Sequence, residues 1–538
     1  MWRTWRIAAA SRVTTTTRRT FPIPIINKTS VPPPPLTTIG FHFQKSTSTL
    51  FPLLPALFLG CLSFAPVLAQ EDISSTDSDG TDFRKLDETS VVSNIHTSKW
   101  RVFTDNARDL FLQGKLEDAE RLFVGALEQA KQGFGIRDPH VASSCNNLAE
   151  LYRVKKAFDK AEPLYLEAIS ILEASYGDED IRVGAALHNL GQFYLVQKKV
   201  DEALTCYERA LKIKRRALGE GHADYAETMY HLGKVLYLKG NAKDAEVLIK
   251  DSIRIIEEGG QAESLLCMRR LQYLVQIYIN VGKFPDALNI QRKILHTMEM
   301  SKGWESLETV IAAESLALII LKSSGSLMEA KELLQRCLDS RRKLLPQDHI
   351  QIAANMLHMA RVECLLYKKT SGDISEAAIL IDNARDHLGN AIRIAQQTLD
   401  KFSKQGVTRN SYEVGRTDKH TQRTALLILL QALNALSKLE VTEADLRGSV
   451  EKDARLSKAE NALLDCISAY RQFGKPMSLS DFAEIKGEYL SCLTHVYALL
   501  SNLKSNSSTQ SKRPTLQEVL NEIKRVESGS SVSSSQKP

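Results

Sequence analysis

Hydrophobic and polar positions follow one pattern that returns every 42 residues between about residues 99 and 260. Each unit holds two stretches whose apolar residues recur at helical spacing, joined by a short polar turn. The first four units begin at Lys99, Val141, Val183 and Tyr225. Their turns lie near Gly114, Lys156, Lys198 and Gly240. The pattern therefore predicts pairs of amphipathic helices, one pair in each unit.

Small residues repeat with the same period on both helices of a unit. One series stands on the first helix and consists of Ala107, Ala149, Gly191 and Gly233. Another stands early on the second helix and consists of Ala119, Ala161, Ala203, Ala245 and Ala287. We expect the small side chains to let the two helices approach closely, and the aromatic series Phe123, Tyr165 and Tyr207 to fill the space one turn later. Glycines at Gly135, Gly177 and Gly219 are expected to end the second helices.

A fixed period of this length means one supersecondary unit stacked many times, each burying its apolar face against its neighbours. The sequences NNLAELY (Asn146–Tyr152) and HNLGQFY (His188–Tyr194), with KAEPLYLEAISILEASYG after the first, resemble the tetratricopeptide repeat, whose usual period is about 34 residues. The longer unit resembles specifically the repeat of kinesin light chains, over roughly residues 99–390. The resemblance implies an all-α fold, a right-handed superhelical solenoid of helix-turn-helix repeats. A heptad-patterned coiled coil before the repeats, which a kinesin light chain uses to join its motor, is missing from the sequence.

The pattern divides the chain into six regions. Residues 99–390 form the repeat array of about six to seven units, and its regularity decays toward the C-terminal end. Residues 391–505 form a C-terminal helical extension, read as a cap over the last open face of the array. Within it a polar loop is expected at Ser403–Lys419, followed by helices at Thr421–Leu439, Leu456–Phe473 and Ser480–Leu503. Residues 506–538 form a mostly disordered tail that includes one more short helix at Pro514–Val526.

The first 98 residues consist of a leader and a linker. Residues 1–50 are rich in Arg, Ser and Thr and lack Asp and Glu, which is typical of an organellar presequence. Residues 51–70 include the charge-free stretch Phe51–Ala69, which is long enough for a single membrane anchor. Val67 and Ala69 also suit a signal-type cleavage site, so the segment is either an anchor or a cleavable sorting signal. Residues 71–98 read as a disordered linker.

Charge and chemical motifs narrow the function. The first 70 residues carry seven basic side chains, which leaves 63 basic against 64 acidic ones in the rest of the chain. A body this close to neutrality disfavours nucleic acid as a partner. The sequence holds no phosphate-binding loop, no nucleophile elbow and no metal-ligand spacing, so we expect no enzyme, no cofactor and no metal site. The eight cysteines lack a C-x-x-C pair and are interpreted as buried thiols.

A groove lined by the first helix of each unit is the surface such an array offers to a protein partner. In the resembled family, asparagines of the N-N-L motif face this groove and bond the peptide backbone. The resemblance therefore implies groove contact for Asn146, Asn147 and Asn189, which match in type, whereas His188 and Tyr230 do not. The alternative is that these amides cap helices or face solvent. His231 is a further candidate because it shares the register of Asn147 and Asn189. Gln192 and Lys234 lie one turn further on, in a second register with Glu150 and Gln276, and complete the candidates.

These observations predict a non-enzymatic scaffold in an organelle that holds a protein or peptide partner in its groove, in the assembly of a membrane complex. We expect a mitochondrial address, at the inner membrane or in the intermembrane space, with the chloroplast thylakoid as the alternative. Two other hypotheses stand beside this one. The first is a cytosolic cargo adaptor of the kinesin light chain kind. The second is organellar RNA binding, which the neutral body and the 42-residue period disfavour.

Overall fold

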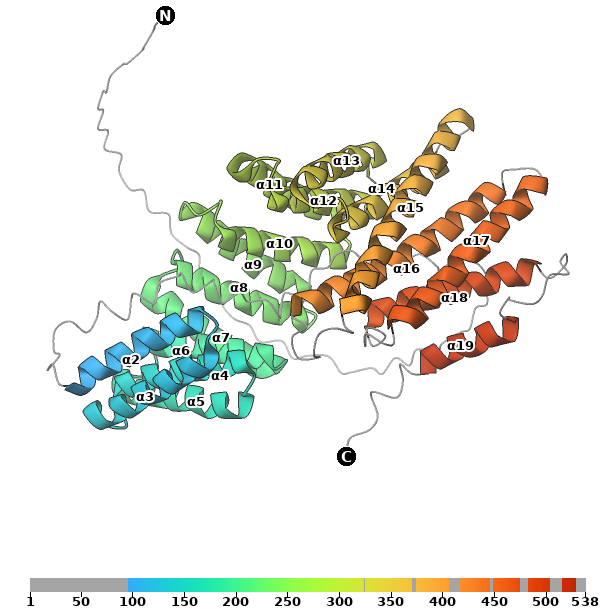
Figure 1. Cartoon of the computed structure of the whole chain (residues 1–538). Helices are drawn as coiled ribbons and strands as arrows, with labels where there is room; N and C mark the ends of the chain where they lie inside the picture. The colour runs from blue at the N-terminus through green and yellow to red at the C-terminus, as the bar shows by residue number, and fades with distance from the viewer. Residues whose placement is uncertain are drawn as a thin grey trace, which may run out of the picture. The chain divides into compact units, whose positions relative to one another are not determined.

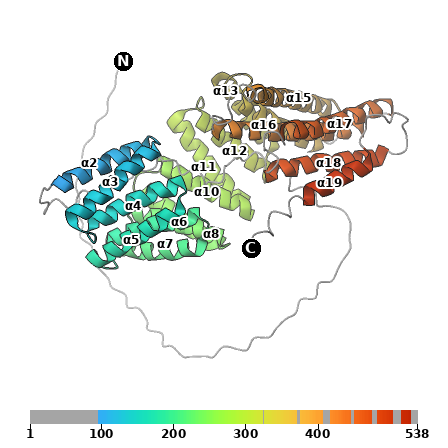
Figure 2. The ribbon, with the colours of Figure 1, turned by 60° about the horizontal axis from the view of Figure 1, so that its bottom comes forward.

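The computed structural model describes residues 95–323, 325–369, 374–405, 416–445, 449–474, 482–503 and 515–528. Within these ranges every regular element is a helix, and the fold is the all-α solenoid that the sequence predicts. Figures 1 and 2 show the helices packed in consecutive antiparallel pairs. The predicted leader and residues 71–94 of the predicted linker lie outside the described part, as do residues 529–538. Residues 95–98, the end of that linker, are helical, because the first described helix begins at Ile95.

The first helix of each pair is called an A helix here, and the second a B helix. The A helices are α2 (Ile95–Leu112), α4 (Pro139–Lys155), α6 (Ile181–Val196), α8 (Ala223–Leu238), α10 (Leu265–Val281), α12 (Leu307–Lys322) and α14 (Ile350–Lys369). The B helices are α3 (Leu116–Phe134), α5 (Phe158–Tyr176), α7 (Val200–Leu218), α9 (Ala242–Glu258), α11 (Phe284–Lys302), α13 (Leu327–Leu344) and α15 (Ile374–Gln405). Each A helix packs against its own B helix, and each B helix against the next A helix.

Turns between the two helices of a pair have the same backbone conformation in five successive units. Their central residue has positive φ, and two of the five are lysines, Lys156 and Lys198. The other three are Gly114, Gly240 and Gly282. Positive φ costs a non-glycine residue about 1 to 2 kcal/mol, so the packing of the helix pair compensates for that strain at the lysines. The predicted turn positions are confirmed.

Close helix contact explains the two series of small residues. Ala107, Ala149, Ala119 and Ala161 are fully buried. A Cβ atom added to Gly233 would lie 2.7 Å from Cγ1 of Ile249, too close for two carbon atoms. The expected close approach of the A and B helices is therefore confirmed.

B helices end where the sequence predicts. Gly135, Gly177 and Gly219 cap α3, α5 and α7 with φ of 91°, 88° and 83°. Their ψ angles of 160° to 170° place them in a region open almost only to glycine. The next A helices then start at capping side chains. Asp138, for example, accepts a 2.8 Å bond from the backbone nitrogen of His140.

Beyond α15 the helix pairs continue. The helices there are α16 (Arg416–Ala444), α17 (Ser449–Ala469, extended by a π turn, Tyr470–Gly474), α18 (Ala483–Leu503) and α19 (Leu516–Ser528). They overlap the four helices expected from the apolar pattern. Both ends of the expected loop Ser403–Lys419 are helical, because α15 extends to Gln405 and α16 begins at Arg416, and its centre lies outside the described residues. Helix α16 contacts both α14 and α18, in the way that α6 contacts α4 and α8. The C-terminal helices thus extend the pairwise stacking of the array.

One described helix is long and apolar enough by composition to span a membrane. It covers Lys419–Ala444, within α16, and 72% of its apolar window is buried inside the protein. That burial is what the core helix of a helical array shows, since α16 packs against α14, α15, α17 and α18. The anchor candidate Phe51–Ala69 lies outside the described residues.

Candidate partner-binding face of the A helices

The six predicted groove residues lie on three neighbouring A helices. Asn146 and Asn147 are on α4, and both are half-buried. Asn189 and Gln192 are on α6 and are half-buried as well. On α8, His231 and Lys234 are each only 4% exposed. The structure therefore gives a partner readier access to the α4 and α6 positions than to those on α8, and groove contact stays a prediction for all six.

Asparagines of successive repeats bond to each other. The Nδ2 atom of Asn189 donates to Oδ1 of Asn146 at 3.0 Å, across the contact between α4 and α6. The amide of Asn147 makes no hydrogen bond with any residue in the described part of the chain. Since an amide group both donates and accepts, Asn147 is equipped to bond the backbone of a bound segment.

A row of polar side chains extends this contact from α6 to α8. Nδ1 of His188 lies 3.0 Å from Oγ1 of Thr228, and the amide nitrogen of Gln192 donates to Nε2 of His188 at 3.1 Å. His188 and Thr228 are buried. The histidine that the family motif does not match therefore has a structural role, because it joins two neighbouring A helices.

Helices α8 and α10 are joined by an ion pair between a buried arginine and a half-buried glutamate. Arg270 is fully buried and bonds to the carboxylate of Glu227, and its Nη1 atom donates to the carbonyl oxygen of Ser252 at 3.1 Å. His231 bonds the same carboxylate at 3.0 Å. Burial acts to raise the pKa of Glu227, but His231 and Arg270 hold that pKa below its ordinary value. The sequence carries no signal for a buried Arg270, since Arg269 and Arg270 together resemble a solvated surface pair.

Lys234 lies among tyrosines contributed by two repeats. Its Nζ atom is 5.5 Å from the ring centre of Tyr230 and 6.0 Å from that of Tyr273. The two rings stand edge to face at 5.8 Å, and Tyr237 meets Tyr273 in the same way at 6.2 Å. Along the candidate face, the described side chains are therefore amides on α4 and α6, and aromatic rings around Lys234 on α8 and α10.

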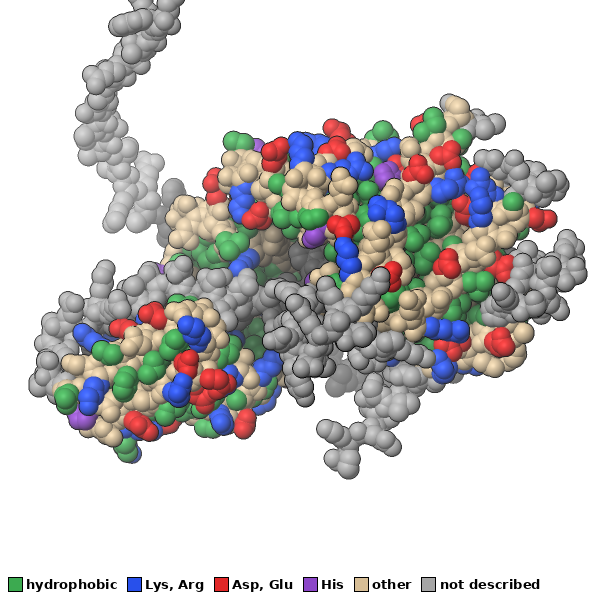
Figure 3. Space-filling view, viewed as in Figure 1, with side chains coloured by type: hydrophobic (Ala, Val, Ile, Leu, Met, Phe, Trp, Pro, Cys, Tyr) green, Lys and Arg blue, Asp and Glu red, His purple; other side chains and the backbone are tan. Residues whose placement is uncertain are grey.

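Charged side chains of both signs are interspersed with apolar ones on the face that Figure 3 presents. Within the described ranges, His, Cys, Asp and Glu side chains nowhere gather in a group that could hold a metal ion. An open depression is lined by Glu117, Glu120, Arg121 and Val124, all from α3. Glu120 there is bonded to Lys155 and Tyr152, which ties it to the structure of the repeat.

Acid is expected to destabilise the array through its buried histidines. Burial lowers the pKa of His358 to about 3, and that of His188 well below its ordinary value of 6.5. The unfolded chain binds protons at these histidines more readily than the folded chain does. The stability that the neutral histidines contribute is therefore fully present above pH 6.5, and the free energy of unfolding decreases as the pH falls from 6.5 toward the folded-state pKa. The expected loss is about 1.4 kcal/mol per pH unit for each histidine.

Thermal unfolding at pH 7, 6 and 5 checks this expectation. The variant His188→Gln with His358→Gln should show a smaller fall of the melting temperature between pH 7 and 5 than the unaltered chain. Replacing the exposed His296 by Gln serves as the control and should leave the fall unchanged. Equal pH dependence in all three proteins would contradict the assignment.

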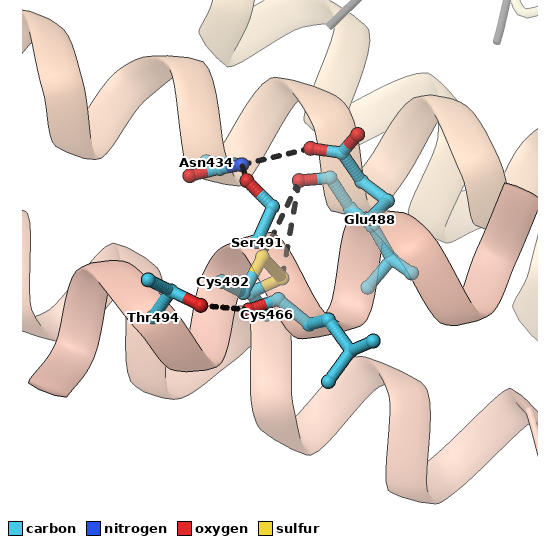
Figure 4. The surroundings of a disulfide bond; sticks show 8 residues. Asn434, Cys466, Glu488, Ser491, Cys492 and Thr494 are labelled. Carbon is cyan, nitrogen blue, oxygen red and sulfur yellow. Dashed lines mark hydrogen bonds between the residues drawn. A yellow bond between two sulfur atoms is a disulfide. The ribbon is translucent and has the colours of Figure 1, made fainter. Parts of the chain in front are cut away.

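The cysteine prediction is confirmed in part and wrong in part. Cys145, Cys206, Cys267 and Cys337 are buried free thiols, and burial raises the pKa of Cys337 to about 12. The pair Cys466 and Cys492, however, forms a disulfide between α17 and α18, with 6.6 Å between the Cα atoms. Figure 4 shows this bond beside Asn434, whose Nδ2 atom donates to Glu488 at 2.8 Å and to Ser491 at 2.9 Å. Sequence spacing could not show the pair because helix packing alone brings the two residues together. Cys61 lies outside the described residues.

Comparison with known proteins identifies the family of the repeats. Residues 101–174 and 182–258 match the tetratricopeptide repeat family, so this part of the chain consists of such repeats. The remaining helix pairs extend the same all-α solenoid. No curated protein matches the chain.

Several solved structures are similar to parts of the chain. The nearly identical TPR-like repeats of a Podosopora anserina protein described as a kinesin light chain are 19% identical, with a TM-score of 0.36, over 38% of this chain and 98% of that one. BtubC (BKLC) from P. vanneervenii is 15% identical, with a TM-score of 0.24, over 55% and 91%. The apo form of RapI is 12% identical, with a TM-score of 0.37, over 56% and 99%. These similarities concern the fold alone.

Proposed function

We propose that this protein is a non-enzymatic scaffold that holds a segment of a partner protein on the A helices of its tetratricopeptide repeats. The observation that carries the proposal is the half-buried amide of Asn147, which has no hydrogen-bond partner among the described residues and lies next to the bonded pair Asn146 and Asn189. Tetratricopeptide repeats are protein-binding modules, and an unoccupied amide on this face suits the backbone of an extended segment.

Alanine at both Asn147 and Asn189 tests the proposal. We expect the double variant to lose most of the partner proteins that the full chain retains in pull-downs from organelle extracts. Loss of two backbone hydrogen bonds costs about 1 to 3 kcal/mol, or roughly a five- to hundredfold loss of affinity. The matched control is Asn390→Ala, an exposed amide on the B helix α15. Full retention of the same partners by the double variant would reject this face as the binding site.

We further propose an organellar location, in mitochondria at the inner membrane or in the intermembrane space, and a role in the assembly of a membrane complex. The basic, acid-free composition of residues 1–50 and the charge-free stretch Phe51–Ala69 support this location. The Cys466–Cys492 disulfide also favours an oxidising compartment. The chloroplast thylakoid is the alternative, since its lumen fits the same features.

Mass spectrometry of N-terminal peptides from purified organelles distinguishes the locations. A mature start near Gln70 indicates a protein released into an intermembrane space or lumen, and a start before Phe51 indicates a retained anchor. An intact Met1 in the cytosol would overturn the organellar proposal and favour a cytosolic cargo adaptor of the kinesin light chain kind.

A further inference from the structure

Helices α14 and α16 contact each other, and one hydrogen bond shows which of their residues lie at the same level. Nη2 of Arg361 on α14 donates to Oε1 of Gln431 on α16 at 2.8 Å. Seven residues further along, α14 carries Lys368 and α16 carries Lys438. Two helical turns advance both chains by about 10 Å, which brings the two lysines to the same level. Consistent with this geometry, Lys438 lies within electrostatic reach of both Lys368 and Arg361. We call these three side chains the cationic strip.

The two lysines of the strip have no ion pair with a residue in the described part of the chain. Nearby carboxylates already have partners. Glu488 is 4% exposed and accepts a hydrogen bond from Asn434, and it attracts Lys438 only at a distance. Glu440 and Glu443, on α16 beside Lys438, pair with Arg385 and Arg455. The two lysines are therefore a local excess of positive charge in a chain whose body is near neutrality.

The charge of Lys438 destabilises the folded chain. Burial lowers the pKa of this lysine, and Lys368 and Arg361 add to the lowering, against the attraction of Glu488. A buried cation that is poorly compensated destabilises the folded chain. Lys438 is half-buried and Lys368 is exposed, so both side chains are accessible to a ligand.

We propose that the cationic strip docks an acidic peptide segment of a protein partner, with carboxylates about 10 Å apart that meet Arg361 and Lys438 or Lys368. Charge complementarity selects this occupant, since two lysines lie at one level, with Arg361 two turns away, where the described carboxylates are paired elsewhere. In a polyproline II segment, which has three residues per turn and a rise of about 3.1 Å per residue, side chains three residues apart lie on the same face about 9 Å apart, which is close to the two-turn spacing of the strip. This docking point lies on α14 and α16 and is separate from the amide face of α4 and α6, so either can fail without the other.

Fluorescence anisotropy with the full chain tests the proposal. The probe is a fluorescein-labelled peptide of four Glu-Gly-Ser repeats, and the same peptide with Gln in place of Glu reports on binding that needs no charge. We expect the Glu peptide to bind at low salt and to weaken as salt is added. The double variant Lys368→Gln with Lys438→Gln is expected to bind it about tenfold more weakly, since each lost contact is worth up to about 1 kcal/mol.

The matched control removes two exposed lysines from B helices, Lys212→Gln on α7 and Lys243→Gln on α9, and should leave the affinity unchanged.

Lys438→Met alone should weaken peptide binding and keep or raise the melting temperature, because it removes a destabilising charge. Equal binding of the Glu and Gln peptides, or equal affinity of the two double variants, would overturn the proposal. So would tighter binding of a single-stranded oligonucleotide of the same charge. The variant Asn147→Ala with Asn189→Ala should bind the Glu peptide normally, which keeps this test independent of the amide face.

Discussion

Replacing Cys466 and Cys492 together by alanine is expected to lower the free energy of unfolding of the C-terminal helices by about 3 to 4 kcal/mol. The disulfide closes a loop of 26 residues that joins α17 to α18, and a cross-link of this length removes about that much chain entropy from the unfolded state. Both sulfur atoms are buried beside α16, so the bond also fixes the packing of three helices.

Urea unfolding of the oxidised chain, with hydrogen exchange read for α17 and α18, measures the effect. Reductant should shift the unaltered protein toward the double variant and leave the double variant itself unchanged. A chain that unfolds at the same urea concentration with and without reductant, and with both cysteines replaced, would show that the bond does not form. Hydrogen exchange is needed because helices of a repeat array can unfold separately.

The second large effect is expected at Arg270. Replacement by alanine leaves the carboxylate of Glu227 with one partner fewer and opens a void where a fully buried side chain stood. Breaking a buried ion pair from one side costs about 3 to 5 kcal/mol, and we expect the lower end of that range because the Glu227 carboxylate is 31% exposed and keeps its bond to His231. Because Arg270 joins α8 to α10 and also bonds Ser252 of α9, the loss should separate the repeats on its two sides.

Thermal unfolding compares this variant with Arg254→Ala, which removes an exposed arginine that pairs with Glu258 within α9. The control should unfold like the unaltered chain, since exposed ion pairs contribute little. Equal melting temperatures for Arg270→Ala and Arg254→Ala would reject the structural role of the buried pair. Replacing both Arg270 and Glu227 by apolar residues should cost less than Arg270→Ala alone, because no carboxylate is then left without its arginine.

Local features of the repeats could be predicted because they depend on residues close in sequence. The 42-residue period sets the helix pairs, and Gly135, Gly177 and Gly219 set their ends through backbone angles open almost only to glycine. The small residues Gly191 and Gly233 predicted the close contact of A and B helices within a unit. For the candidate site, the sequence could predict only which positions of successive A helices are equivalent, because these recur with the 42-residue period. It could not predict which of these positions are exposed to a partner and which are buried by neighbouring helices.

What only the tertiary structure decided is which side chains the packing of different units brings together. From the sequence alone, Arg270 would be expected at the surface. In the structure it is fully buried and pairs with Glu227, because α10 packs beside α8. Cys466 and Cys492 carry no motif, and they meet because α17 docks on α18. Sequence periodicity fixes the face of a helix on which a residue lies. Burial, pairing and charge excess depend on neighbours that are 20 to 70 residues away along the chain, and these are set when the repeats stack.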